Sequence, residues 1–226
     1  SSKLYSIDND GLFHHDFYGI IKKSGRVNIQ LLLRAFRNYC KKNHIIIEEK
    51  INYNDLVINN SSVIFRDIKA KHILFSEGYA VVNNPYFKGL NLKPTKGEIL
   101  TIYCKDLKLN KIIHSRLMII PLGNDYYAIG ATYDWKNING NPTLQAKKKI
   151  QDILDSNINL KYEIVDHFAG IRPSTIDRRP LVGSHKKYNY IHILNGLGTR
   201  GVLLGPYLSK CLFEHIYSGV SIPNEA

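Results

Sequence analysis

The sequence predicts a mixed α/β fold, and three observations support this. Helix and strand patterns alternate in the first part of the chain. From about residue 98 the pattern changes to mostly antiparallel strands. The third observation is a C-terminal strand, glycine turn and closing helix.

The composition is that of a globular protein with a core of its own. Of 226 residues 44% are hydrophobic, and no stretch resembles a membrane helix or signal peptide, so we expect a soluble, cytoplasmic protein. Cys40, Cys104 and Cys211 are widely spaced, which favours free thiols in a reducing compartment over disulfides or zinc. The net charge of +12 is compatible with a nucleic-acid partner, but the lysines are scattered, so a basic surface is the simpler interpretation.

The first predicted element is a β-hairpin over 11–27, where glycine turns separate short apolar segments. It contains His14, His15 and Asp16, which are residue types that bind metals. Neighbouring residues on a strand point to opposite faces, so this run has poor geometry for a metal ion. We expect no metal site here.

A helix and three short strands follow in the pattern. Residues 28–43 place apolar side chains at helical spacing, and Asn28 is the expected N-cap. A continuously apolar strand is expected at 45–48. Two strands at 55–59 and 63–65 are expected to form a polar meander around a turn.

Residues 70–79 predict a buried strand that ends in a turn at Gly78. Ligands of α/β sheets bind at the carboxyl ends of strands, so Gly78 is a place where the backbone could approach a cofactor. An ordinary turn glycine is an equal alternative. A short helical turn is expected at 83–87.

The middle of the chain has an antiparallel pattern with one helix. Strands are expected at 98–103, 111–121, 126–133 and 161–168. A hairpin turn is expected at 123–125, and a helix is expected to start at 141–143.

Near the C-terminus, Gly196, Gly198 and Gly201 spell G-x-G-x-x-G after a strand that starts at Tyr190. A dinucleotide fingerprint opens a βαβ unit with an acidic residue about 20 positions on, and neither feature follows here. We interpret the loop as the start of the closing helix, where N–H groups and missing Cβ atoms let a flat ligand approach. A tight strand-to-helix turn is the alternative. The helix is expected to bury one stripe, made of Leu204, Leu208, Cys211, Leu212 and His215.

No nucleophile, zinc-protease or Walker motif is present, so in an enzyme a cofactor would carry the chemistry. Arg172 is the most informative charge, because the following Pro173 restricts its backbone and fixes where its side chain starts. A fixed guanidinium suits bidentate binding of a carboxylate. A structural ion pair, for example with Asp177, is an equal alternative.

Several motifs together resemble the family of FAD-dependent D-amino-acid and glycine oxidases. They occur in the family's order and cover nearly all of the chain. In chain order the motifs are Ile73-Leu-Phe-Ser-Glu-Gly78, Lys96-Gly97-Glu98-Ile-Leu100, Pro121-Leu-Gly-x-x-Tyr-Tyr-Ala-Ile-Gly130-Ala-Thr132, Gly170-Ile-Arg172-Pro173-Ser-Thr-x-Asp177-x-x-Pro180-Leu-Val-Gly183 and Asn195-Gly-Leu-Gly198-Thr-Arg200-Gly201-Val-Leu-Leu-Gly205-Pro206.

The resemblance implies an FAD/NAD(P)-binding flavoprotein fold interleaved with an antiparallel-sheet substrate domain. The FAD-domain segments would be 26–95 and 169–226, and the substrate-domain segments would be 1–25 and 96–168. It implies FAD as the cofactor and oxidation of the C–N bond of an amino acid or secondary amine by hydride transfer to the flavin. Arg172 would pair with the substrate carboxylate, and Gly78 would lie at a strand end that contacts FAD. The other implied cofactor-binding residues are Gly170, Asn195, Gly196, Leu197, Gly198, Thr199, Arg200, Gly201 and Val202.

The sequence departs from the family pattern in two places. The family's N-terminal βαβ unit with its own G-x-G-x-x-G loop is absent, so we expect a truncated form and an upstream nucleotide-binding segment. Met118 occupies the hairpin position where glycine oxidases have a substrate-facing tyrosine. Arg116 lies two residues earlier, on the same face of the expected strand, where it would bind a second acidic group or be surface charge.

Two other functions stay open. One is a non-catalytic binding module of the same fold. The other is the oxidase part of a tRNA wobble-uridine modifying enzyme, which shares the C-terminal signature and would bind tRNA through the basic surface.

Overall fold

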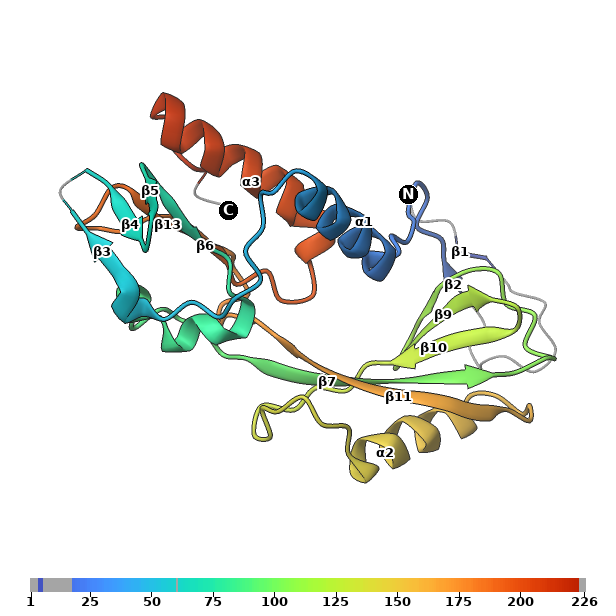
Figure 1. Ribbon diagram of the computed structural model, residues 1–226. Helices are drawn as coiled ribbons and strands as arrows, with labels where there is room; N and C mark the ends of the chain where they lie inside the picture. Colours follow the sequence, from blue (N-terminus) through green and yellow to red (C-terminus); the bar gives the residue numbers. More distant parts are fainter. Residues whose placement is uncertain (1–3, 6–17, 60, 224–226) are drawn as a thin grey trace. The chain divides into compact units, whose positions relative to one another are not determined.

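The computed structural model of the protein describes residues 4–5, 18–59 and 61–223. The chain forms two compact units (Figure 1). The first unit comprises Ser1–Ile20 and Asn91–Arg178, and the second comprises Ile21–Leu90 and Arg179–Ala226. The domain limits expected from the sequence remain a prediction about which segments fold together.

A five-stranded antiparallel sheet forms the centre of the first unit, in the order β11-β7-β10-β9-β8. Its strands are β7 (Thr95–Tyr103), β8 (Ile113–His114), β9 (Met118–Gly123), β10 (Tyr126–Gly130) and β11 (Glu163–Arg172). The hairpin between β9 and β10 turns at 123–125, where all three residues have positive φ, as the sequence predicts. The longest strands, β7 and β11, pair along nearly their whole length.

Helix α2 (Leu144–Asp155) covers one face of this sheet (Figure 1). The Thr143 hydroxyl caps its first turn by accepting a hydrogen bond from the Ala146 N–H, 3.2 Å away. Ile150 and Leu154 are buried among sheet residues such as Leu100 and Ile129. The core of the first unit therefore lies between this helix and the sheet.

The first unit also contains the two-residue strands β1 (Leu4–Tyr5) and β2 (Tyr18–Gly19), which pair in antiparallel fashion. Residues 11–17 of the hairpin expected at 11–27, with His14, His15 and Asp16, lie outside the described residues. From Ile20 onward the chain belongs to no strand until β3, so the second half of that hairpin is not formed.

Two three-stranded sheets make up the second unit. β3 (Leu56–Ile58), β4 (Val63–Phe65) and β5 (Ile68–Ala70) form an antiparallel meander, of which the sequence predicts the first two strands. The other sheet has the order β12-β13-β6, with β6 (Ile73–Phe75), β12 (Leu181–Ser184) and β13 (Ile191–Asn195). β6 and β13 run parallel, so their carboxyl ends meet at one edge of this sheet.

The helices of the second unit are α1 (Ile29–Lys42) and α3 (Gly201–Ser218). Asn28 caps α1 by accepting from the Leu31 N–H at 3.0 Å, as the sequence predicts. On α3, Leu208 and Leu212 are buried and the other residues of the expected stripe are half-buried. A 3-10 helix over Gly78–Asn83 and another over Pro85–Phe87 occupy the region of the expected helical turn. None of the described helices is long and apolar enough to cross a membrane.

The strand expected at 45–48 is not formed, and the strand expected over 70–79 is shorter than predicted. Residues 45–48 are irregular, and Ile45 and Ile47 are more than half exposed. A strand requires a neighbour for its hydrogen bonds, and no strand of the described part pairs with this segment. β6 covers only three residues and Leu74 is 47% exposed, because only one of its two edges is paired.

Replacing Ile129 with alanine should destabilise the first unit. Its side chain is fully buried in the core of the sheet. Removing this much buried hydrocarbon lowers the free energy of unfolding by about 2–5 kcal/mol. Chemical denaturation followed by circular dichroism measures this change.

The matched control is Ile112→Ala, because Ile112 is 45% exposed. We expect this substitution to change the unfolding free energy by less than about 1 kcal/mol. Equal losses for the two variants would contradict the placement of the core.

Candidate functional site

The end of β11 places Arg172 beside the beginning of β7. In the antiparallel ladder Arg172 lies opposite Thr95, and Gly170 lies opposite Gly97. Pro173 follows directly and ends the strand. The Arg172 side chain therefore starts from a backbone that a long strand pair fixes.

The guanidinium of Arg172 lies flat against the backbone of Gly97. A Cβ atom built on Gly97 would be 2.1 Å from Nη1 of Arg172, so only glycine leaves this space open. Arg172 Nη1 donates to the Thr132 carbonyl at 3.3 Å. The guanidinium carbon of Arg172 also lies 4.8 Å from the centre of the Tyr133 ring, a cation–π distance.

Tyr133 in turn stacks with Trp135, with ring centres 6.1 Å apart and planes 22° from parallel. Both rings are 54% exposed, so this aromatic surface is open to a ligand. Burial lowers the pKa of Arg172, and the neighbouring Tyr133 acts in the opposite direction. An arginine stays charged in proteins despite such a shift. The site therefore offers a fixed, partly desolvated positive charge next to aromatic rings.

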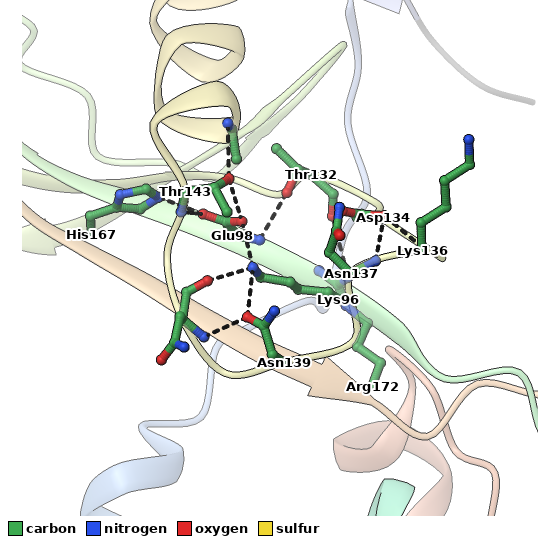
Figure 2. Close-up of polar contacts among 12 residues, drawn as sticks. Lys96, Glu98, Thr132, Asp134, Lys136, Asn137, Asn139, Thr143, His167 and Arg172 are labelled. Atoms are coloured by element: carbon green, nitrogen blue, oxygen red, sulfur yellow. Dashed lines mark hydrogen bonds and ion pairs between the residues drawn. The ribbon is translucent and has the colours of Figure 1, made fainter.

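A buried ion pair lies on the same strand as Gly97 (Figure 2). Lys96 Nζ is 3.1 Å from Glu98 Oε1, and these side chains are 0% and 3% exposed. Lys96 also donates to Asn139 Oδ1 at 3.3 Å and to the Asn141 carbonyl. The two residues are two apart on a strand and so share a face, which brings their charges together.

Glu98 connects this pair to the start of α2 and to β11. Its carboxylate accepts from the Thr143 N–H at 2.7 Å and from the Thr143 hydroxyl at 2.9 Å. His167 Nε2 lies 2.9 Å from Glu98 Oε2, but without the alignment of a hydrogen bond. Burial acts to raise the pKa of Glu98, but the hydrogen bonds from Thr143 and Lys96 and the lysine charge outweigh it, so the net shift is downward.

The second unit brings the predicted glycine positions together at one edge of its parallel strand pair. Gly78 follows β6 and Gly196 follows β13. Asn195 Nδ2 donates to the Gly78 carbonyl at 3.0 Å, and its Oδ1 accepts from the Gly196 N–H at 2.8 Å. Gly78, Gly196 and Gly198 all have φ between +54° and +69°, a region that favours glycine.

A carboxylate supports the turn before Gly78. Glu77 accepts from the Tyr53 hydroxyl at 2.5 Å and from Asn84 Nδ2 at 2.7 Å. Burial and the nearby Glu77 raise the pKa of Tyr53 to about 12, so this hydroxyl remains a donor. The side-chain contacts of Glu77 thus hold the turn in place. The space beside Gly78 is open, because a Cβ there would meet no atom within 4 Å.

The loop from Gly196 to Arg200 leads into α3, whose first residues are Gly201 and Val202. The first turn of any helix leaves N–H groups without a partner in the helix and carries partial positive charge. Val202 is 53% exposed. Open glycine backbone, N–H groups and exposed apolar surface suit a flat ring that carries hydrogen-bond acceptors, so the residues fit a flavin.

The other predicted site residues are placed differently. Gly170 lies inside β11, which belongs to the first unit. Met118 is the first residue of β9 and is half-buried. Arg116 is exposed in the turn between β8 and β9, so the expectation that it shares a strand face with Met118 is wrong. The single strand expected at 111–121 is two strands, β8 and β9, because residues 115–117 bend between them.

Sequence reasoning assigned no role to Gly97, Tyr133 or the buried pair. The Lys-Gly-Glu spacing of residues 96–98 was a usable signal, because opposite charges two apart on a strand share a face. No local pattern predicts the contact between Tyr133 and Arg172, because Tyr133 follows β10 and Arg172 ends β11, far apart in the sequence.

Comparisons with known proteins agree on one family. Residues 12–215 match the protein family described as "FAD dependent oxidoreductase". Over 150 residues the chain is 33% identical to glycine oxidase from Bacillus subtilis. The aligned residues cover 62% of this chain and 39% of that protein. The chain is 26% identical over 168 residues to the tRNA 5-methylaminomethyl-2-thiouridine biosynthesis bifunctional protein MnmC of Marinobacter nauticus, covering 67% of this chain and 26% of that protein.

Solved structures show the same fold. Iminodiacetate oxidase from Chelativorans superposes with a TM-score of 0.76 at 18% identity, over 93% of this chain and 60% of that one. Glycine oxidase from Bacillus cereus gives a TM-score of 0.65 at 20% identity, over 74% and 49%. These likenesses confirm the predicted flavoprotein fold. The chain spans less than half the length of the curated relatives described here.

Replacing Glu98 with glutamine should strongly destabilise the first unit. The substitution leaves the Lys96 charge buried without its carboxylate. Breaking one side of a buried ion pair lowers the free energy of unfolding by about 3–5 kcal/mol. Equilibrium denaturation at neutral pH measures the loss.

The matched control is Glu49→Gln, since Glu49 pairs with Arg66 at 2.7 Å but both side chains are about half exposed. An exposed pair contributes about 0–1 kcal/mol. Because folding lowers the pKa of Glu98 from 4.5, its contribution is complete above that pH and is lost as the pH falls through the folded value. Glu98→Gln should therefore weaken the acid dependence of stability, and an unchanged acid profile would contradict the role of this pair.

Proposed function

Because the chain belongs to the FAD dependent oxidoreductase family, we propose that it binds a small amino acid or secondary amine and FAD for oxidation of the substrate's C–N bond. Bound FAD would supply the acceptor for the hydride that leaves the substrate carbon. The chain's own residues would bind and orient the two molecules. Free Cys40, Cys104 and Cys211 support a reducing compartment, and we propose the cytoplasm.

The observation that carries this proposal is the fixed guanidinium of Arg172. Among the described residues it makes one hydrogen bond, to the Thr132 carbonyl, although a guanidinium has five N–H donors. Gly97 and Tyr133 both contact the guanidinium and hold its plane in place. Its remaining N–H groups can therefore donate to a bidentate partner. A carboxylate matches this fork in both charge and geometry. Glycine oxidase and iminodiacetate oxidase, by their names, act on amino-carboxylates.

We assign the cofactor to the glycine loop of the second unit. The Gly196 and Arg200 N–H groups already donate to Asn195 Oδ1 and to the Leu197 carbonyl. The other N–H groups from Leu197 to Val202 would donate to acceptor atoms of the flavin ring, and Gly78 would let the ring approach the end of β6. Asn195 ties the two strand ends together and so fixes the loop. The family resemblance and the open glycine backbone support these assignments. Gly170, which lies in the ladder between β7 and β11, is assigned to the cofactor on the same grounds.

The substrate site has no assigned acid–base pair. Orientation by Arg172 would therefore be the chain's main contribution, since positioning a reactant by itself accelerates a reaction substantially. Met118 would contact the substrate from the start of β9. Arg116 is exposed and would bind a second acidic group only for a larger substrate.

The chain supplied with the family's N-terminal nucleotide-binding segment, purified and reconstituted with FAD, tests this proposal. We expect the visible flavin absorbance to stay with the protein after gel filtration and to bleach when glycine, sarcosine or iminodiacetate is added without oxygen. A protein that retains flavin but is bleached by no amine would refute the substrate class. A protein that stays colourless would refute the cofactor assignment.

Replacing Arg172 with alanine should weaken carboxylate substrates selectively. Loss of a desolvated charge partner costs about 2–4 kcal/mol in kcat/KM, while FAD stays bound. The comparison is kcat/KM for the amino acid against that for the corresponding amine without a carboxylate. Equal losses for both substrates would contradict the role of Arg172.

Gly97→Ala gives the same test without removing the charge. Its Cβ would displace the guanidinium of Arg172, so KM for the carboxylate substrate should rise. The matched control is Gly140→Ala, where a Cβ meets no atom within 4 Å. Unchanged KM in Gly97→Ala would show that Arg172 does not hold the substrate.

A second candidate, an RNA partner, rests on the net charge of +12 and the similarity to a tRNA-modifying relative. Binding through phosphates releases counterions, so affinity for tRNA would fall steeply as salt rises. Filter binding from low to physiological salt measures the slope. A flat or absent signal would leave the small-molecule oxidoreductase as the only candidate.

A further inference from the structure

The second unit contains a pocket of about 950 Å³ near the start of its parallel strand pair. His72 directly precedes β6 and Tyr190 directly precedes β13, and both residues line the pocket. The glycine loop follows the opposite, carboxyl ends of the same two strands. The pocket is therefore separate from the residues assigned to the cofactor.

The pocket wall is basic. Lys69 and Lys71 line it, and none of the described aspartates and glutamates does. The two lysines flank Ala70 at the end of β5, so their side chains leave the same face of the chain. Ala70, Tyr190 and Ile216 add apolar surface. A ligand with a negative group and an apolar part matches this combination.

A chain of hydrogen bonds between side chains runs along the pocket. His72 Nδ1 is 3.0 Å from His192 Nε2, and His192 Nδ1 is 2.8 Å from Ser184 Oγ. Ser184 Oγ is also 3.1 Å from His215 Nε2, and His215 Nδ1 is 3.0 Å from the Val220 carbonyl. All four of these side chains line the pocket.

The Val220 carbonyl at the end of this series determines which atom donates in each of its hydrogen bonds. A carbonyl only accepts, so His215 Nδ1 carries a proton, and its Nε2 in the neutral ring accepts from the Ser184 hydroxyl. Ser184 Oγ then accepts from His192 Nδ1–H, which makes Nε2 of His192 an acceptor. Burial, with smaller effects of His72 and His215, lowers the pKa of His192 to about 4, which keeps this ring neutral near pH 7.

His72 must therefore donate from Nδ1 to His192. A neutral His72 then has a bare Nε2, the one ring nitrogen that the hydrogen-bond chain leaves uncommitted. Such a nitrogen repels an anionic oxygen, whereas a protonated Nε2 donates to it. The other groups packed on His72 are the rings of His192 and Tyr217, with centres 5.2 and 5.8 Å away.

We propose that this pocket binds a small organic anion, an aryl or alkyl phosphate or carboxylate, through Lys69, Lys71 and His72, with uptake of one proton by Nε2 of His72. The lysines supply charge, and the hydrogen-bond chain presents His72 as a donor on the ligand side. The apolar wall at Tyr190 and Ile216 accommodates the rest of the ligand. This site is independent of the proposed oxidoreductase activity.

Isothermal titration calorimetry of the FAD-free chain with phenyl phosphate, benzoate and neutral phenol tests the proposal. We expect saturable binding of at least one anion and none of phenol, and the stronger anion identifies the group that is recognised. Lys69→Ala/Lys71→Ala should weaken binding about tenfold or more, since each charged hydrogen bond contributes roughly 1.5–3 kcal/mol. The matched control Lys148→Ala/Lys149→Ala removes the same charge from α2 in the other unit and should leave the affinity unchanged.

Titration in two buffers of different ionisation enthalpy measures proton uptake. The unmodified chain should take up about one proton at neutral pH. His72→Gln, whose amide can still donate to His192, should abolish the uptake. The proposal is overturned if neither anion binds, if both double-lysine variants lose affinity equally, or if the anion binds without proton uptake.

Discussion

The buried pair of Lys96 and Glu98 is the interaction on which the first unit depends. Two charges without solvent are stable only when their remaining hydrogen-bond capacity is satisfied. The structure meets this condition with the backbone and hydroxyl of Thr143 and with Asn139. The pair therefore joins β7 to the loop before α2 and to the first turn of that helix, and His167 brings β11 beside it.

The position of Arg172 follows from this arrangement. β7 carries the buried pair, and the residue between its two members is Gly97, against which the guanidinium lies. The Glu98 N–H donates to the Thr132 hydroxyl at 2.9 Å, which holds the segment leading to Tyr133. One short segment of β7 thus positions both Gly97, against which the guanidinium lies, and the segment that carries Tyr133 in the proposed carboxylate site. A change in the ion pair would shift the backbone at Gly97 and thereby the position of the Arg172 guanidinium.

In the second unit, the parallel pair of β6 and β13 separates the two proposed sites, for the cofactor and for an anion. Its carboxyl ends carry the glycine loop, where open backbone replaces side chains. Its amino ends carry histidines and lysines, where charge and hydrogen-bond direction decide what binds. Both sites depend on β13, because Asn195 ends this strand at one site and His192 lies near its start at the other.

The sequence by itself determined most of the helices, the antiparallel strands and the cofactor family, because periodicity, caps and glycine turns are local signals. It correctly placed Asn28 as a cap and the turn at 123–125. It did not determine whether an apolar segment such as 45–48 finds a strand partner, since pairing depends on residues far along the chain. Only the tertiary structure decided that Tyr133 covers Arg172 and that three histidines form one directed hydrogen-bond chain, because those contacts join segments distant in the sequence.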